Sequence, residues 1–372
     1  MPGNLFGLEE RQIHGLSDLE ARFRLLASRG LSAPVNEDLI LGLFEGDILR
    51  ATGSLVGESL QGIAVDRELE GSGGAAAIVS SLIKAGMELG RKHFFLFTKP
   101  HEARIFADLG FSPVASVAPG ASAARPWEGQ GVALLEWGEG SVDGWVRQRA
   151  TADCKAAGFA RARVGGVVVN CNPFTLGHRA LIEYAASQVD RLYVFVVQED
   201  RSLFPFDVRI KLVREGTSDL ANVRVMEGGP YIISQVTFPT YFLKPDKGGE
   251  VAILLHASLD LAIFRARIAP GFGIGKRFVG TEPYCATTSA YNRLMKEILT
   301  SPEGEGPALA LEEIPRFEKG GAPVSASVVR ALIREGSLDK VAELVPAATF
   351  DWLNSDAAAS VLERIRASDS RH

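Results

Sequence analysis

A threonine, a glycine and a histidine in the second half of the chain are the residues best suited to chemistry. Thr175, Gly177 and His178 follow the apolar stretch 164–169 and a turn rich in Asn and Pro. A helix that begins there offers unpaired N–H groups and partial positive charge to a phosphate. Thr175 adds a hydroxyl donor, His178 a ring donor that can be cationic, and Gly177 lets a nucleotide approach the backbone. The pattern indicates stabilisation of charge on an α-phosphate while pyrophosphate leaves.

Two serines and an arginine late in the chain indicate a second phosphate site. Ser325 and Ser327 stand at the start of an expected helix, 325–336, and Arg330 lies about one turn further in. Hydroxyl groups at a helix start and a nearby cation suit phosphate oxygens. Either serine also fits a plain N-cap, and Arg330 also fits a surface ion pair. Both interpretations stay open at this point.

The second half must supply the elements that position these residues. Apolar strands alternate with helices, which predicts a parallel sheet covered on both faces. The expected strands are 164–169, 191–197, 223–226, 251–256, 277–279 and 308–311, and the expected helices are 178–187, 207–215 and 325–336. In such sheets ligands bind beyond the carboxyl ends of the strands, which is where the segment 175–178 falls.

The first half has strands and helices in mixed order. Its expected strands are 39–44, 48–54, 60–65, 94–98 and 132–137, and its expected helices are 75–89 and 102–109. The stretches 113–131 and 138–144 have the composition of linkers. We therefore expect a first domain over 1–145, a linker helix over 146–160, a second domain over 161–353 and a C-terminal tail over 354–372.

Composition limits the classes of partner. The chain has 372 residues, 46% hydrophobic and 23% charged, with a formal net charge of -5. This charge disfavours nucleic acid and anionic membranes as partners, and no apolar run reaches the ~18 residues of a membrane span. The N-terminus has no apolar signal region. The three cysteines are widely spaced and indicate neither a disulfide framework nor a metal site. We expect a cytoplasmic protein.

Several motifs, in order along the chain, resemble one known family. The stretches 170–178, 197–206, 237–244 and 279–284 resemble the citrate lyase ligases, and the resemblance extends from about 35 to 353. The stretches 170–178, 204–215 and 324–330 also resemble the nucleotidyltransferase superfamily with a His-x-Gly-His signature, with Thr175 at the first His. The resemblance implies an α/β protein in which an acetyltransferase-like mixed-sheet domain precedes a Rossmann-like nucleotidyltransferase domain.

The resemblance implies an ATP-dependent acid–thiol ligase. Acetate attacks the α-phosphate of ATP and gives acetyl-adenylate and diphosphate. The thiol of the phosphoribosyl-dephospho-CoA group on the citrate lyase acyl carrier (gamma) subunit then takes the acetyl group, AMP is released and the lyase becomes active. Mg²⁺ is expected with the triphosphate, although no cluster of metal ligands is visible in the sequence.

The resemblance also assigns roles to single residues. It implies catalytic roles for Thr175, His178, Arg209 and Arg330. It implies that the ATP site comprises Asn170, Phe174, Thr175, Gly177, His178, Gly280, Thr281, Ser325, Ser327 and Arg330. Lys244 follows an aromatic-rich loop and either orients acetate or pyrophosphate or is a solvated loop charge.

The glycine-rich stretch 70–75 resembles the acyl-CoA loop of the Gcn5-related acetyltransferases. Glu70 stands where that loop has Gln or Arg, and a carboxylate repels a pyrophosphate. The stretch is otherwise a common turn before a helix. A further hypothesis is that the first domain docks the carrier protein or its CoA-like arm.

Three other functions fit parts of the sequence. One is a nucleotidyltransferase that adenylylates a phosphate acceptor of the pantetheine-phosphate or nicotinamide-mononucleotide type. Another is an acetyltransferase whose second domain binds a nucleotide as a regulator. The third is a degenerate binding module. The products distinguish them, because the ligase makes an acetyl thioester and AMP, whereas the adenylyltransferase makes a dinucleotide.

Overall fold

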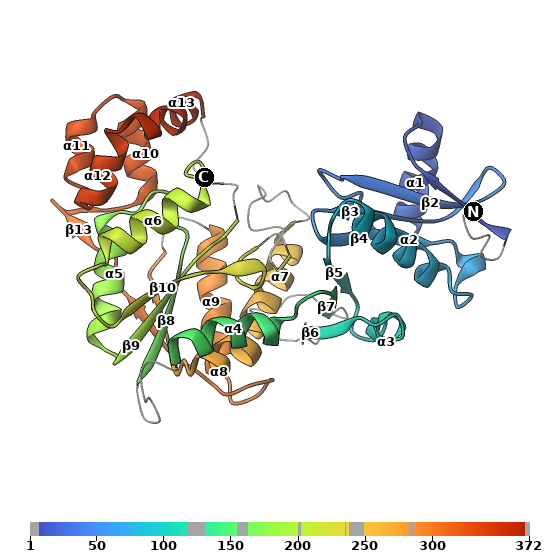
Figure 1. Ribbon diagram of the computed structural model, residues 1–372, viewed down its shortest axis with the longest axis horizontal. Coiled ribbons are helices and arrows are strands. Elements are labelled where there is room, and N and C mark those ends of the chain that lie inside the picture. The colour runs from blue at the N-terminus through green and yellow to red at the C-terminus, as the bar shows by residue number, and fades with distance from the viewer. Residues whose placement is uncertain are drawn as a thin grey trace. The chain divides into compact units, whose positions relative to one another are not determined.

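The computed structural model divides into two compact units (Figure 1). It describes residues 7–117, 131–154, 163–199, 202–234, 236–237, 249–282 and 286–368. Of these, residues up to 117 and 131–141 belong to the first unit, and residues from Val142 onward belong to the second. Lys244 lies outside the described residues. Within the described ranges, every helix is too short or too polar to cross a lipid bilayer.

The first unit is built on a seven-stranded mixed sheet. Its strands are β1 (Glu9–Gln12), β2 (Leu39–Glu45), β3 (Ile48–Val56), β4 (Ser59–Val65), β5 (His93–Thr98), β6 (Ser112–Val117) and β7 (Val132–Gly138). Their order is β1-β2-β3-β4-β5-β7-β6, and all neighbours are antiparallel except β4 and β5. Strand β6 begins one residue before the expected linker 113–131 and takes up its first five residues, while 118–130 lies outside the described residues.

Helices cover both faces of this sheet. The helices are α1 (Leu16–Ser28), α2 (Gly74–Glu88) and the short α3 (Ala103–Ala107). Alternate residues of β2 point to opposite faces, because side chains alternate along a strand. Leu41 and Leu43 are buried in one cluster with Leu82 of α2, whereas Phe44 is buried in another with Leu26 of α1.

The second unit contains a five-stranded parallel sheet. Its strands are β8 (Val164–Val169), β9 (Arg191–Val196), β10 (Val223–Glu227), β11 (Lys276–Gly280) and β12 (Ala310–Ile314). They lie in the order β10-β9-β8-β11-β12, and every neighbouring pair is parallel. The order reverses between β8 and β11, so this is the switch point at which such sheets bind ligands. The two sheets confirm the predicted fold class.

Strand β9 shows why helices cover both faces of the second sheet. All six of its residues are buried. Leu192 and Val194 face the cluster that contains α5 (Leu176–Ser187) and α6 (Phe206–Gly216). Tyr193 and Phe195 lie against Phe272 of α8 (Ala269–Phe272), with ring centroids 4.9 and 5.3 Å apart. A strand without polar alternation is what a sheet buried on both sides requires.

Helix α4 (Val142–Cys154) packs within the second unit. The ring of its Trp145 lies 6.2 Å from that of Phe272 and 5.8 Å from that of Tyr231. The described part of the expected linker helix 146–160 is therefore fixed to the second sheet. The same unit also contains α7 (Gly249–Ile263), the π-helical turn Phe264–Ile268, and α9 (Ala286–Thr300).

The expected strand 251–256 is wrong, because these residues belong to α7. The apolar run that suggested a strand continues to Ile263. A short apolar run does not distinguish a buried helix from a buried strand, and a length of 15 residues favours the helix.

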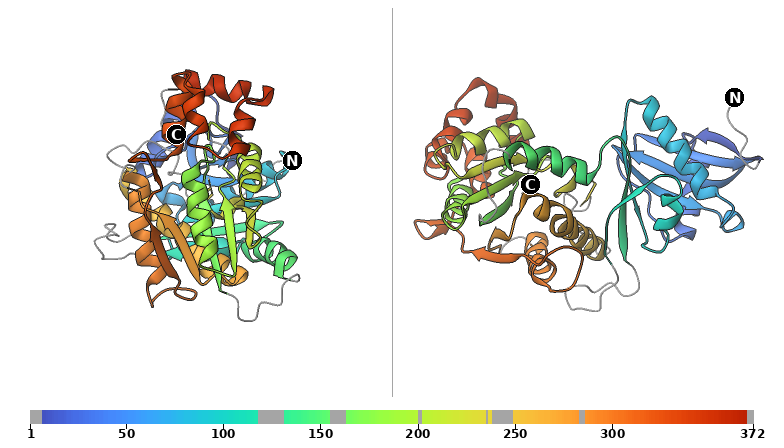
Figure 2. Two further views of the ribbon diagram at one scale, coloured as in Figure 1. Left: turned by 90° about the vertical axis from the view of Figure 1, so that its left-hand side faces the viewer. Right: turned by 60° about the horizontal axis from the view of Figure 1, so that its bottom comes forward.

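The C-terminal helices form one cluster, drawn in red in Figures 1 and 2. They follow the short hairpin β13 (Glu318–Lys319) and β14 (Ala322–Pro323), and comprise α10 (Ala326–Arg334), α11 (Leu338–Ala342), α12 (Ala347–Leu353) and α13 (Ala359–Ala367). Val361 and Ile365 are buried there together with Ile333. Much of the expected tail 354–372 is thus a packed helix.

Candidate active site

A large cavity lies where the order of the parallel strands reverses. Strands β8 and β11 pair through Gly165 with Lys276 and Gly166 with Arg277, at their amino ends. Their carboxyl halves do not pair with each other, and a cavity of about 1210 Å³ lies beyond them. The cavity brings together most of the residues predicted from sequence. Those that line it are Asn170, Thr175, Gly177, His178, Gly280, Thr281, Ser325, Ser327 and Arg330.

The N-terminus of α5 is closed by a reciprocal cap. The hydroxyl of Thr175 accepts a hydrogen bond from the N–H of His178, and Nδ1 of His178 accepts one from the N–H of Thr175 at 3.2 Å. The Thr175 hydroxyl also lies 2.9 Å from the same Nδ1. Thr175 is fully buried. Its hydroxyl therefore positions His178, and Thr175 also lines the cavity.

His178 is a neutral donor in this site. Because Nδ1 accepts a hydrogen bond from the N–H of Thr175, the proton of the neutral ring belongs on Nε2. Burial, with smaller contributions from the charges of Arg316 and Arg330, lowers the pKa of His178 to about 4. The imidazole is thus uncharged at pH 7, one of the two charge states that the sequence allowed.

The N-terminus of α10 lies beside that of α5. The hydroxyl of Ser325 caps α10 by accepting from the N–H of Val328 at 3.3 Å, and it lies 3.0 Å from the hydroxyl of Ser327. A Cβ atom on Gly177 would lie 2.5 Å from the backbone oxygen of Val324. Gly177 is therefore needed so that two protein segments can meet, whereas the sequence had suggested a close approach by a nucleotide. Capping at Ser325 is compatible with ligand binding, because an accepting hydroxyl keeps its own hydrogen.

Arg330 links α10 to the turn after β8. Its Nη1 donates to the backbone oxygen of Asn172, and the side-chain oxygen of Asn172 accepts from the N–H of Phe204 at 3.1 Å. Burial, with a smaller contribution from Arg334, lowers the pKa of Arg330 to about 10, so the group is still charged at pH 7. The cation lines the cavity between the two helix N-termini.

Arg209 and Phe174, predicted to act in catalysis or to bind ATP, do not line the cavity. Arg209 is fully buried, and its guanidinium donates to the backbone oxygens of Asn170, Val197, Glu199 and Phe204 at 2.7–3.0 Å. It positions the carboxyl ends of β8 and β9 and does not line the cavity.

Phe174 is likewise fully buried and belongs to the core between the sheet and α5 and α6. A Cβ atom on Gly216 would lie 2.5 Å from its ring. Phe174 therefore packs in the core next to the turn between β8 and α5 and does not line the cavity, in contrast to the expected contact with ATP.

Arg316 belongs to the site but was not predicted. It lies two residues after β12, lines the cavity, and donates from Nε to the backbone oxygen of Thr281 at 2.9 Å. The expected strand ended at Leu311, three residues before β12 does, so Arg316 did not stand at a predicted strand end. The rule that ligands bind at carboxyl ends of strands would have found it had the strand been placed correctly.

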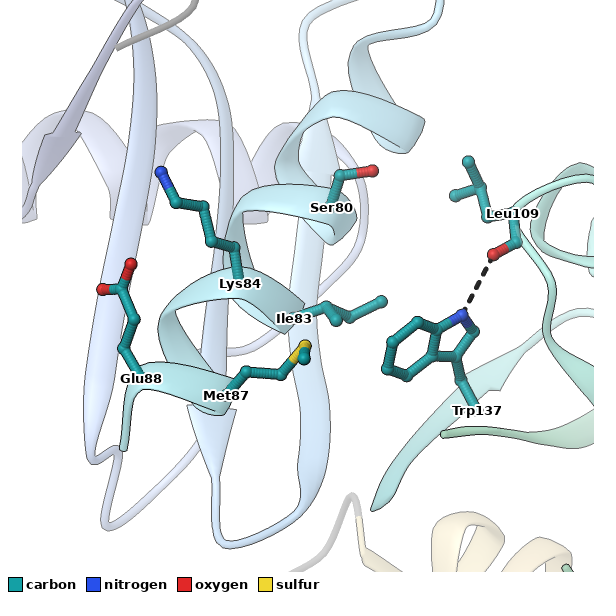
Figure 3. A pocket seen from close by; sticks show the side chains of 7 residues that line it. All are labelled: Ser80, Ile83, Lys84, Met87, Glu88, Leu109 and Trp137. Carbon is teal, nitrogen blue, oxygen red and sulfur yellow. Dashed lines mark hydrogen bonds between the residues drawn. The ribbon is translucent and has the colours of Figure 1, made fainter. Parts of the chain in front are cut away.

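The first unit has a smaller hollow of about 520 Å³ on the outer side of α2 (Figure 3). Trp137 closes one side of it, and its Nε1 donates to the backbone oxygen of Leu109 at 3.2 Å. The glycine-rich stretch 70–75 does not line this hollow. Glu70 instead pairs with Arg29, and the stretch caps α2 through Gly73 at φ +89°.

The combination of a parallel sheet, a switch-point cavity and two capped helix N-termini defines a nucleotide-binding α/β domain. A sequence model of the citrate lyase ligase C-terminal domain matches residues 164–353. A [citrate [pro-3S]-lyase] ligase from Klebsiella pneumoniae is 39% identical over 90% of this chain and 92% of its own length. One from Escherichia coli is 35% identical over 89% of each. The chain belongs to the citrate lyase ligase family.

Among solved structures, the ribosomal-protein-S18-alanine N-acetyltransferase from Escherichia coli is similar over 36% of this chain and 95% of its own. The identity is 16% and the TM-score is 0.29. As for metals, no group of three or more His, Cys, Asp or Glu side chains within the described ranges is arranged to hold an ion.

Gly280 allows a test of the cavity by filling it. No atom lies within 4 Å of a Cβ built on Gly280, which lines the cavity, or on Gly275, which precedes the other end of β11. We expect Gly280→Val to weaken ATP binding at least tenfold and Gly275→Val to leave it unchanged, with both unfolding free energies within about 0.5 kcal/mol of wild type. Calorimetric titration and urea unfolding measure the two quantities. Equal ATP affinity in both variants would contradict the expectation that ATP binds in the cavity lined by Gly280.

Arg209 allows a test of how much its hydrogen bonds to backbone carbonyl groups stabilise the second unit. Arg209→Met keeps the approximate length of the side chain but removes the donor to four carbonyl groups, two of them in buried and two in partly buried hydrogen bonds. We expect a loss of unfolding free energy on the order of 3 kcal/mol. Arg214→Met, on an exposed position of the same helix, should change it by less than about 0.5 kcal/mol. Urea denaturation of the two variants measures the difference. Equal unfolding free energies in Arg209→Met and Arg214→Met would show that the hydrogen bonds of Arg209 do not stabilise the protein.

Proposed function

We propose that the protein is an ATP-dependent acetate–thiol ligase that activates citrate lyase, releasing AMP and diphosphate. The observation that carries the proposal is the pair of capped helix N-termini, at Thr175 and Ser325, which line one switch-point cavity together with Arg330. Membership of the citrate lyase ligase family supports the same activity. The adenylyltransferase alternative has no comparable support in the curated relatives, which are named ligases.

ATP enters this cavity as a polyanion. The N–H groups of Gly177 in α5 and of Ala326 and Ser327 in α10, together with the hydroxyls of Ser325 and Ser327, hold its phosphates, because the N–H groups of Leu176 and His178 already donate to Leu344 and Thr175. Arg330 supplies positive charge. Gly280 and Thr281 line the cavity at the end of β11, and Asn170 at the end of β8. Mg²⁺ enters with the triphosphate as part of the substrate and offsets its charge.

In the first step an oxygen of acetate attacks the α-phosphorus of ATP. The bond from that phosphorus to the bridging oxygen breaks, diphosphate leaves, and acetyl-adenylate forms. His178 stabilises the charge that develops on the phosphate oxygens through its Nε2–H, because a neutral donor placed in advance needs no reorganisation. Arg330 stabilises the same charge through its guanidinium.

In the second step a thiolate attacks the carbonyl carbon of the acetyl group. The thioester forms, AMP leaves with the oxygen that came from acetate, and the thiol proton is released. We assign the thiol to the prosthetic group of the citrate lyase acyl carrier subunit, since the family relatives are named for that lyase. A reaction that consumes a free thiol needs a reducing compartment, which places it in the cytoplasm.

Isotope exchange between ATP and labelled diphosphate tests the first step alone. We expect exchange that requires both Mg²⁺ and acetate. His178→Ala should lower its rate by about 100-fold, because one preorganised donor to the reacting phosphate is lost. His101→Ala, an exposed histidine of the first unit, is the matched control and should exchange at the wild-type rate. Exchange without acetate, or equal rates in the two variants, would contradict the proposal.

The lowered pKa of His178 predicts that ATP binding takes up a proton. In the free protein the pKa is about 4, so at pH 5 the ring is mostly neutral. A bound polyanion raises this pKa, because a nearby negative charge favours the protonated ring. Calorimetric titration of ATP in buffers of different ionisation enthalpy should show proton uptake at pH 5 that fades above about pH 7. The uptake should fall in His178→Asn, and an unchanged value would assign it to another group.

A further inference from the structure

Arg316 and Glu282 meet at the mouth of the cavity. Glu282 follows β11 by two residues and Arg316 follows β12 by two residues. The two strands are parallel neighbours, and Gly280 of one is in register with Ile314 of the other, so both residues emerge at the same edge. The Nη2 atom of Arg316 is in direct hydrogen-bonding contact with the carboxylate of Glu282. Both residues line the cavity, with side-chain exposures of 24% and 13%.

The guanidinium of Arg316 is held in one orientation. Its Nε donates to the backbone oxygen of Thr281 at 2.9 Å, which fixes the plane of the group. A guanidinium fixed at Nε presents its outer nitrogens to an anion in a geometry that suits a planar carboxylate. Glu282, in the free protein, is such a carboxylate.

Arg316 and Arg330, two of the three arginines that line the cavity, have different kinds of partner. Arg330 donates to the backbone oxygen of Asn172, which cannot leave without moving the turn after β8. Arg316 donates to a carboxylate on a side chain, which can rotate away. Both charges act on His178, and that of Arg316 acts more strongly. Arg316 and His178 line the same cavity.

We propose that Arg316 binds the carboxylate of the acid substrate and that Glu282 is a resident carboxylate which holds Arg316 until the substrate displaces it. The assignment deepens the proposed function and rests on it. It favours a carboxylate over a phosphate oxygen because the group already bound there is a carboxylate, and because the two helix N-termini already supply a phosphate site. Neutralising the charge of the acid by Arg316 also reduces its repulsion from the α-phosphate.

The two residues should then have opposite effects on acetate. Glu282→Gln removes the competing charge at nearly constant size, and we expect the KM for acetate in ATP–diphosphate exchange to fall about threefold, as for a partly exposed ion pair. Arg316→Lys keeps a charge but loses the planar fork, and we expect the KM for acetate to rise at least tenfold. The KM for ATP should change less than twofold in both variants. Glu305→Gln, which alters another Arg–Glu pair of the same unit, should leave both values unchanged.

The outcomes separate the alternatives. An ion pair that only ties the strand ends together would make both variants raise the KM for acetate, together with a lower melting temperature, and this would overturn the proposal. A change in the KM for ATP instead of acetate would assign Arg316 to the phosphates and also overturn it.

A binding measurement makes the test independent of turnover. Saturation-transfer NMR on the acetate methyl group, with Mg²⁺ and a non-hydrolysable ATP analogue present, should give the same order of affinities: Glu282→Gln, wild type, Arg316→Lys. Absence of exchange in the wild-type protein would count against the proposed function, whereas absence of this order would count against the role of Arg316.

Discussion

The site depends on the close approach of two helix N-termini. Helix α5 begins directly after the first strand of the sheet, and α10 begins about 150 residues later in the chain. They meet because Gly177 has no side chain to collide with the backbone oxygen of Val324 and because Arg330 binds the backbone oxygen of Asn172. Two partial positive charges that would repel each other are thus held side by side, and a polyanion between them relieves that repulsion.

The remainder of the second unit can be understood as support for that arrangement. The carboxyl halves of β8 and β11 are not paired with each other, which leaves room for a ligand. Arg209 donates to backbone carbonyl groups at the carboxyl ends of β8 and β9, and Phe174 packs in the core next to the turn after β8. The chemistry is carried by few side chains, and most of the residues of the motif act by fixing where those few stand.

Strand–helix alternation predicted the parallel sheet, and most of the site residues that the family resemblance implied line the cavity. Such alternation favours a parallel sheet, and residue types alone predicted that Ser325 or Ser327 could cap a helix, whereas the cap at Thr175 was not predicted. The patterns did not distinguish residues that face the ligand from residues that support it. Phe174 lies in the same motif as His178, and Arg209 lies in another motif of the same resemblance, but burial decides their roles, and burial depends on the tertiary packing.

Arg316 escaped prediction for a different reason. Strand β12 is an edge strand with exposed or half-buried acidic residues, so its apolar pattern stops before the strand does. The helix over 251–256 shows the converse error, since a buried helix and a buried strand look alike in a short apolar run.

The central claim is that acetate attacks the α-phosphorus of ATP in the switch-point cavity. The most direct measurement uses acetate labelled with ¹⁸O in both oxygens, ATP, Mg²⁺ and the thiol-bearing acyl carrier subunit, with mass analysis of the products. The account predicts AMP that contains one labelled oxygen and diphosphate that contains none. Unlabelled AMP, or label in diphosphate or orthophosphate, would contradict it.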